Sequence, residues 1–131
     1  MPNKKLASEW FEFAVRDFET AILLNRENHY TDVIAVDVQQ AIEKAMKAVY
    51  AFYGEKIPRT HSLDILFNYV SGYINWKDVE IKDLIMVNDY YQTERYPGPK
   101  YFMPDRDEIK RAIQLAKTIL SQVNDHIMSS E

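Results

Sequence analysis

The 131-residue sequence has no cysteine, only three glycines and no long apolar run. The absence of cysteine excludes disulfide frameworks, thiol nucleophiles and thiolate zinc sites. Average usage would give about nine glycines in this length, so phosphate-cradling glycine loops and turn-rich all-β folds are disfavoured. No stretch approaches the roughly 18 apolar residues of a membrane span, and residues 1–12 do not have the order of a signal peptide. We therefore expect a cytoplasmic, mostly helical protein with no membrane partner.

The charged side chains do not form any of the usual catalytic or metal-binding patterns. Sixteen basic and 20 acidic residues give a net charge of −4. His29, His61 and His126 stand far apart, and none has a second metal ligand three or four residues away along a helix. Nucleophile elbows, Walker loops and dinucleotide fingerprints are absent. The sequence thus predicts neither a metal site nor a cofactor.

Apolar residues recur at helical spacing through almost the whole chain. In the first segment, Phe11, Val15, Phe18 and Ile22 follow one another at steps of four, three and four. The pattern predicts an all-α, antiparallel up-and-down bundle of about five helices in a single domain, residues 1–131. The expected helices cover 4–28, 32–53, 63 to about 72, 78–91 and about six turns from 105.

Several residues are predicted to begin or end these helices. Gly54 should stop the second helix in a left-handed conformation, and Asp78 should cap the fourth. Asp105 with Glu108 three residues later is typical of a capping box. The residues predicted to share one face of the fourth helix are Ile81, Leu84, Ile85 and Asn88.

One segment, residues 90–106, combines aromatic and basic side chains. From 95 to 106 there are three basic residues and one acidic residue. Aromatic rings stack on bases and guanidinium groups bind phosphates, so the segment is suited to a nucleotide or single-stranded RNA. The alternative is a structural role, in which tyrosines pack a proline-braced loop against the bundle. The candidate nucleotide-binding residues are Arg95, Tyr96, Lys100 and Tyr101.

Asp17 lies on an apolar stripe of the first predicted helix and therefore needs a partner. Lys44, Arg59 or Arg95 could supply the opposite charge. Two interpretations remain open: an ion pair at the bundle edge that sets helix register, or a role in a site. Asp17, Lys44 and Arg59 are secondary site candidates.

His61, the last secondary candidate, comes just before the third predicted helix. We interpret His61 or Ser62 as a capping residue, because no acidic residue that could orient the imidazole follows locally. Glu43, four residues before Lys47, predicts an ion pair along the second helix. The polar face of that helix, interpreted as solvated, consists of Gln40, Lys44 and Lys47.

Four motifs follow one another along nearly the whole chain. They are Ala14-x-x-Asp17-Phe18-x-x-Ala21, Gln39-Gln40-Ala41-x-Glu43-Lys44-x-x-Lys47-Ala48, Pro58-Arg59-Thr60-His61-Ser62-Leu63 and Tyr91-x-x-x-Arg95-Tyr96-Pro97. None is specific alone, but their order and spacing resemble the HEPN family, the helical domains named for higher eukaryote and prokaryote nucleotide binding. The resemblance implies the helical bundle that periodicity predicts independently.

Many HEPN proteins resemble metal-independent ribonucleases, in which an arginine is followed four to six positions later by a histidine. Arg95 matches the arginine, but residues 99–102 include no histidine, and Tyr96 replaces the usual polar neighbour. Without an imidazole, acid–base cleavage of RNA loses its natural proton carrier. The chain therefore resembles the non-catalytic, nucleotide-binding branch, and we predict no catalytic residues.

Members of that branch are similar to toxin–antitoxin modules, each paired with a separate minimal nucleotidyltransferase. This chain has no Gly-Ser followed by paired acids, the motif that such a transferase needs to bind two metals. We expect a homodimeric partner protein that binds an ATP-like nucleotide. One alternative is a degenerate ribonuclease toxin that uses Arg95 with Lys100, Tyr101 or His61, with RNA as its partner. Another is a structural dimer joined through its tyrosine-rich face.

Overall fold

Five helices and their connections make up the part of the chain that the computed structural model describes, residues 2–92, 98 and 103–129. These ranges contain no strand, which confirms the predicted all-α class. The helix ends lie within a few residues of the predicted ones. The helices are α1 (Lys4–Arg26), α2 (Thr31–Phe52), α3 (Leu63–Val70), α4 (Ile81–Gln92) and α5 (Arg106–Ser129).

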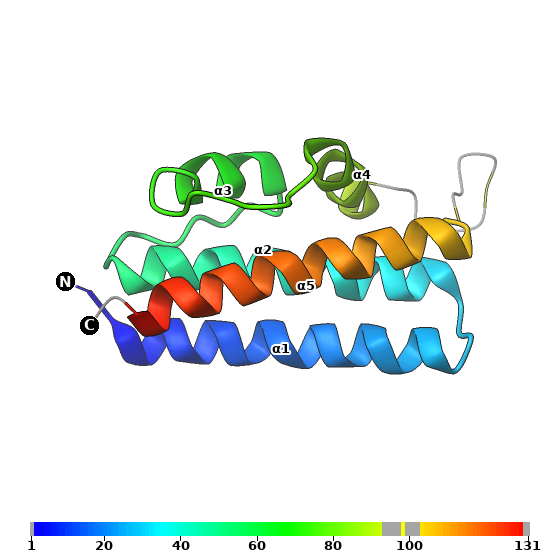
Figure 1. Cartoon of the computed structure of the whole chain (residues 1–131), viewed down its shortest axis with the longest axis horizontal. Coiled ribbons are helices and arrows are strands. Elements are labelled where there is room, and N and C mark those ends of the chain that lie inside the picture. Colours follow the sequence, from blue (N-terminus) through cyan, green and yellow to red (C-terminus); the bar gives the residue numbers. More distant parts are fainter. Residues whose placement is uncertain (1, 93–97, 99–102, 130–131) are drawn as a thin grey trace.

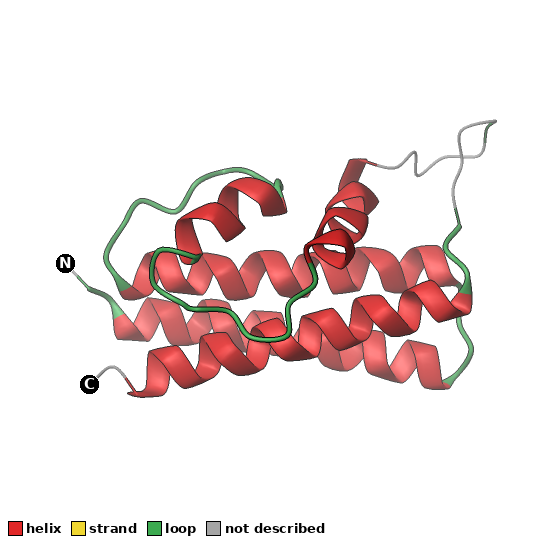
Figure 2. Cartoon of the chain, turned by 45° about the horizontal axis from the view of Figure 1, so that its top comes forward, coloured by secondary structure: helices red, strands yellow, loops and turns green. Residues whose placement is uncertain are grey.

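Three long helices, α1, α2 and α5, pack against one another as a bundle, and the two short ones cover one side of this bundle (Figure 1). α1 and α2 are antiparallel, whereas α5 runs in the same direction as α2 because α3 and α4 return the chain between them. α4 lies at a steep angle to the long helices (Figure 2). No helix within the described ranges is long and apolar enough to cross a membrane.

α2 is the central helix of the bundle. It packs against each of the other four helices, and 16 of its 22 residues are buried. Its alanines Ala41, Ala45 and Ala48 are fully buried, which lets neighbouring helices approach closely. Because α2 is surrounded, four of its polar residues are buried as well, namely Thr31, Gln39, Glu43 and Lys47.

The seam between α1 and α2 is built from small residues. Ala7, Ala14 and Ala21, spaced two turns apart, have no exposed surface. The larger residues of the predicted stripe, such as Phe11 and Phe18, are only partly buried against the core. A methyl group fits the line of closest approach between two helices, and bulkier side chains pack on either side of it.

α4 buries a different face from the predicted one. Ile81 and Ile85 are 53% and 51% exposed, whereas Leu84, Val87 and Tyr90 are buried. α4 contacts α2, α3 and α5 together, so the positions that face these three neighbours form its apolar side. The predicted Asp78 cap is also wrong: Asp78 has a φ of 59°, and α4 begins only at Ile81.

Two other predicted helix ends are present. Gly54 has a φ of 72°, the left-handed conformation expected after α2. Asp105 Oδ1 accepts a hydrogen bond from the Glu108 backbone N–H at 2.8 Å, so it caps α5. The Glu108 carboxylate accepts a 2.7 Å hydrogen bond from the Tyr90 hydroxyl. It therefore links α5 to α4 and does not complete a capping box.

Stacked tyrosines hold the α3 end of the molecule against α2. Tyr50 stacks on Tyr69, and Tyr53 stacks on Tyr73, each with ring centroids 3.8 Å apart. The Tyr53 hydroxyl also lies within hydrogen-bond distance of His126 Nε2 on α5. These tyrosines are part of the packing between elements.

Candidate functional site

A polar stripe runs along α2 through the interior of the protein. Gln39, Glu43 and Lys47 follow one another at intervals of one helical turn. Gln39 is fully buried, and the other two residues are each 6% exposed. Glu43 Oε2 lies 3.0 Å from Lys47 Nζ, and Gln39 Nε2 donates to Glu43 Oε1 at 3.1 Å. The predicted Glu43–Lys47 pair is confirmed. The interpretation of Lys47 as part of a solvated face is wrong, because the α2–α3 connection and α1 close over this side of α2.

His61 joins this stripe from the α2–α3 connection. Its Nδ1 lies 3.0 Å from Glu43 Oε1, and its backbone carbonyl accepts a 3.2 Å hydrogen bond from Gln39 Nε2. The His61 side chain is 47% exposed, whereas that of Glu43 is 8% exposed. The acidic residue that orients the imidazole thus comes from α2, 18 positions earlier in the chain.

The predicted capping role of His61 or Ser62 is not what these residues do. Ser62 precedes α3 without a side-chain capping bond, and the Leu63 N–H donates to Asn88 Oδ1 on α4 at 2.7 Å. The Ser62 N–H donates to Thr60 Oγ1 at 3.1 Å. Contacts with α2 and α4 therefore replace local capping and hold the connection in place around His61.

The network keeps Glu43 ionised. Burial by itself would raise the pKa of this carboxyl, but the hydrogen bonds from Lys47, His61 and Gln39 outweigh burial and hold the pKa below its usual value. Lys47 Nζ also lies 5.8 Å from the ring centroid of Trp10 on α1, a distance suited to a cation–π contact. The buried stripe therefore holds one carboxylate and one ammonium, with the partly exposed imidazole beside the carboxylate.

Asp17 and Lys44 form a second ion pair on the same two helices. Lys44 Nζ donates to Asp17 Oδ2 at 2.7 Å, and the side chains are 25% and 22% exposed. Lys44 is therefore the partner that Asp17 was predicted to need, and the pair lies at the edge of the α1–α2 seam. Burial, together with the Asp17 charge, raises the pKa of the nearby Asp37 despite the opposing effect of Lys44.

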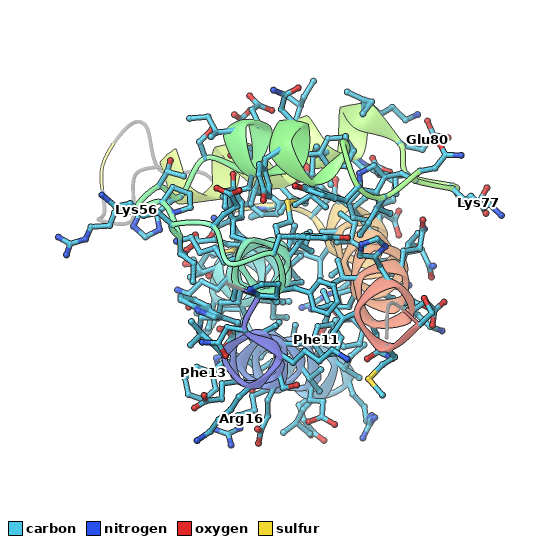
Figure 3. The ribbon with its side chains drawn as sticks, turned by 90° about the vertical axis from the view of Figure 1, so that its left-hand side faces the viewer. Phe11, Phe13, Arg16, Lys56, Lys77 and Glu80 are labelled. Atoms are coloured by element: carbon cyan, nitrogen blue, oxygen red, sulfur yellow. The ribbon has the colours of Figure 1, made fainter. Side chains whose placement is uncertain are left out.

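An apolar groove of about 240 Å³ lies on α1 beside these pairs. Figure 3 shows Phe13 on the side of α1 away from α5, whereas Phe11 lies on the α5 side. Lys44 Nζ is 6.0 Å from the Phe13 ring centroid. The residues that line the groove are Leu6, Glu9, Trp10 and Phe13.

The α2–α3 connection also exposes positive charge. Lys56 and Arg59 are both exposed, and Lys56 projects from the outer side of the molecule in Figure 3. Arg59 does not pair with Asp17, whose hydrogen-bonding partner is Lys44. Arg59 instead lies two residues before His61, so these two secondary candidates share one short segment.

The main sequence candidates, Arg95, Tyr96, Lys100 and Tyr101, lie outside the described residues. Gln39 and Glu43 belong to the second family motif, and Glu43 was also predicted to pair with Lys47, but neither residue was predicted to be part of a site. The signal that could have identified them is their spacing, because polar residues at 39, 43 and 47 lie one turn apart on one stripe of the helix. Among the residues that the structure describes, no group of three or more His, Asp or Glu side chains could hold a metal ion.

Comparison with known proteins identifies the family. The HEPN domain model matches residues 7–126, so the chain belongs to the HEPN family. ST0689, an archaeal HEPN homologue, has the same fold, with a TM-score of 0.69, 22% identity and coverage of 97% of this chain and 99% of that one. TT1696 from Thermus thermophilus gives a TM-score of 0.70 and 23% identity, covering 92% of this chain and 97% of that one. No curated protein matches the chain.

Proposed function

We propose that this HEPN protein is a non-catalytic module that binds a nucleotide and acts as the partner of a separately encoded minimal nucleotidyltransferase, in a toxin–antitoxin-like pair. The observation that carries the proposal is the partly exposed His61 ring, held by the buried Glu43 carboxylate at 3.0 Å. The same connection exposes Lys56 and Arg59. A fixed imidazole beside exposed cations suits a phosphate-bearing ligand.

The proposal includes further ligand contacts from the residues between the fourth and fifth helices. In the proposal, the Arg95 guanidinium binds a phosphate, and Lys100 adds positive charge. Tyr96 or Tyr101 stacks on the base, because an aromatic face binds any nucleobase. The protein acts as a homodimer in the cytoplasm.

Calorimetric titration of ATP tests nucleotide binding. Replacement Arg95→Ala should weaken binding by about tenfold or more, since a hydrogen bond to a charged group contributes about 1.5–3 kcal/mol. Arg16→Ala is a matched control: this arginine is exposed and pairs with Glu12 one turn away on α1. No ATP binding by the wild type, or equal affinities in wild type and Arg95→Ala, would contradict this part of the proposal.

The nucleotidyltransferase partnership is tested separately. If an adjacent reading frame encodes a minimal nucleotidyltransferase, the two proteins should co-purify when expressed together, with only one of them tagged. Absence of such a frame, or purification of each protein alone, would contradict the partnership while leaving nucleotide binding intact.

A second candidate function, metal-independent RNA cleavage, is favoured by the same Glu43–His61 pair. A histidine oriented by a carboxylate is a common general acid–base arrangement. Purified protein in EDTA should then cleave RNA, and His61→Ala should remove the activity. Growth arrest on expression without a partner would agree with this function. Harmless expression with intact cellular RNA would rule it out.

A further inference from the structure

We infer that the apolar groove on α1 is the contact surface for a second copy of this chain, and that Phe13 of each copy fills the groove of the other. The two α1 helices cross antiparallel, with the two-fold axis beside Phe13. The proposed function supplies the homodimer on which this inference rests, and the side chains of α1 define the surface and the orientation of the copies.

α1 carries an exposed aromatic ring directly beside an apolar groove. Leu6, Glu9, Trp10 and Phe13 line this groove of about 240 Å³. The Phe13 side chain is 49% exposed, and that of Leu6 is 37% exposed. A single exposed apolar residue is common on protein surfaces, but a protruding ring beside an apolar groove is typical of a contact site, where aromatic residues are enriched.

The Phe13 ring is held in place before any partner binds. Arg16 Cζ lies 5.1 Å from its centroid, and Lys44 Nζ lies 6.0 Å from it, both suited to cation–π contacts. Phe13 and Arg16 lie on the side of α1 away from α5, where a second molecule has access (Figure 3). A side chain that is already ordered loses little conformational freedom on association.

A protruding ring and a groove on one patch suit a second copy of the same chain. In a two-fold contact each copy presents the same surface to the other, so the patch must complement itself. When two α1 helices cross antiparallel at Phe13, residues before Phe13 in one copy face residues after it in the other. Leu6 and Thr20 lie seven residues before and after Phe13, so Leu6 of each copy faces the exposed Thr20 of the other.

The charges beside Phe13 favour the antiparallel orientation. Glu9 precedes Phe13 by four residues and Arg16 follows it by three, and at about 100° per residue both project to the same side of the ring. An antiparallel crossing therefore brings Glu9 of each copy to Arg16 of the other, whereas a parallel crossing opposes like charges. Among the described residues Glu9 has no ion pair. Rim charges of this kind set orientation more than affinity, so removal of one alone changes the affinity little.

Disulfide cross-linking tests the surface and the orientation together, because the chain has no cysteine of its own. Leu6→Cys and Thr20→Cys proteins are mixed under reducing conditions and then oxidised with diamide. The mixture should form a disulfide-linked dimer on a non-reducing gel. Each variant alone should form little, since like positions lie about 20 Å apart along the crossed helices. Leu6→Cys mixed with Ile85→Cys, at a 51% exposed position on α4, is the control and should not cross-link.

Dimer affinity tests the individual side chains. Phe13→Asp should raise the dimer dissociation constant about tenfold or more, because it places a charge where an apolar ring fills the groove. Ile85→Asp is the matched control and should leave the constant unchanged. Arg16→Glu should weaken the dimer by opposing Glu9, and addition of Glu9→Arg to that variant should restore it. Sedimentation equilibrium measures each constant, and circular dichroism checks that each variant is folded.

The results separate the contact surface from the homodimer itself. If wild type is a monomer at all concentrations, both are overturned. If wild type is a dimer that Phe13→Asp leaves intact, and the Leu6→Cys and Thr20→Cys mixture does not cross-link, the α1 contact is wrong while the homodimer stands. Efficient cross-linking of Leu6→Cys with itself would overturn the antiparallel orientation.

Discussion

At the scale of single residues, Glu43 is the most informative side chain in the described protein. It is buried and ionised, and it accepts hydrogen bonds from Gln39, Lys47 and His61. Removing one member of a buried pair leaves the other charge without a partner, which commonly costs about 3–5 kcal/mol. The Asp17–Lys44 pair is more exposed, so the same change there should cost less.

The stability of the protein should therefore depend on Glu43 in acid. Folding lowers the pKa of Glu43 from its usual 4.5, so its contribution is complete above that value and is lost as pH falls through the folded-state pKa. The raised pKa of Asp37 acts with the opposite sign. Urea unfolding of wild type and Glu43→Gln from about pH 6 to pH 3 isolates the Glu43 effect, since Asp37 is common to both. We expect wild type to lose more stability than the variant, and parallel curves would contradict the assignment.

At the scale of helices, close packing of α1 on α2 depends on small residues. Ala14 has no exposed surface and lies midway between Ala7 and Ala21 on the seam. The seam also sets the distance between the Asp17–Lys44 partners, which come from different helices. A change in helix separation would thus act on both packing and charge.

Ala14→Leu should overpack this seam. We expect a loss of about 1–3 kcal/mol in unfolding free energy, because a dense core cannot absorb three extra carbons without backbone shifts. Ser8→Leu is the control, since Ser8 is exposed on the same helix and should change stability by about 0.5 kcal/mol or less. Chemical denaturation measures both variants. Equal midpoints would show that the seam has spare volume.

The contact between α4 and α5 makes a second prediction at this scale. Tyr90 is 4% exposed, and burial followed by its bond to Glu108 raises its pKa far above the usual range for tyrosine. Tyr90→Phe should lower the free energy of unfolding by about 1 kcal/mol, the usual net contribution of one hydrogen bond. Tyr30→Phe, at a 66% exposed position, should be neutral. Thermal unfolding of the two variants distinguishes these outcomes. An equal loss of stability in both would contradict a stabilising role for the Tyr90–Glu108 hydrogen bond.

At the scale of the whole molecule, three long helices form a bundle, and α3 and α4 lie on one side of it (Figure 1). The candidate site lies where the α2–α3 connection meets the central helix, so the most buried helix supports a partly exposed candidate, His61. The net charge of −4 does not reveal this local arrangement, because it is a sum over the whole chain.

The proposed homodimer is tested on the intact protein. Light scattering coupled to size exclusion should give twice the chain mass of 15.5 kDa. The value should persist on dilution through the micromolar range if the interface is of standard size. A monomer at all concentrations would contradict both the homodimer and the structural-dimer alternative.

Much of the architecture and part of the candidate site could be predicted from residue order. Helical periodicity located all five helices because each depends on contacts of period 3.6 along its own sequence. The Gly54 and Asp105 ends were predictable because their chemistry is local. A cationic partner for Asp17 was predictable because a carboxylate among apolar residues requires a compensating charge. Lys44 is that partner.

The sequence by itself therefore determined the helical class, the family motifs and the need for buried charge compensation, all of which follow from local chemistry. Only the tertiary structure decided that α4 buries Val87 and exposes Ile85, because that choice depends on which neighbours surround it. It also decided the contact between His61 and Glu43, which lie 18 residues apart in the sequence. Contacts between distant residues depend on how helices dock, and helical periodicity contains no information about docking.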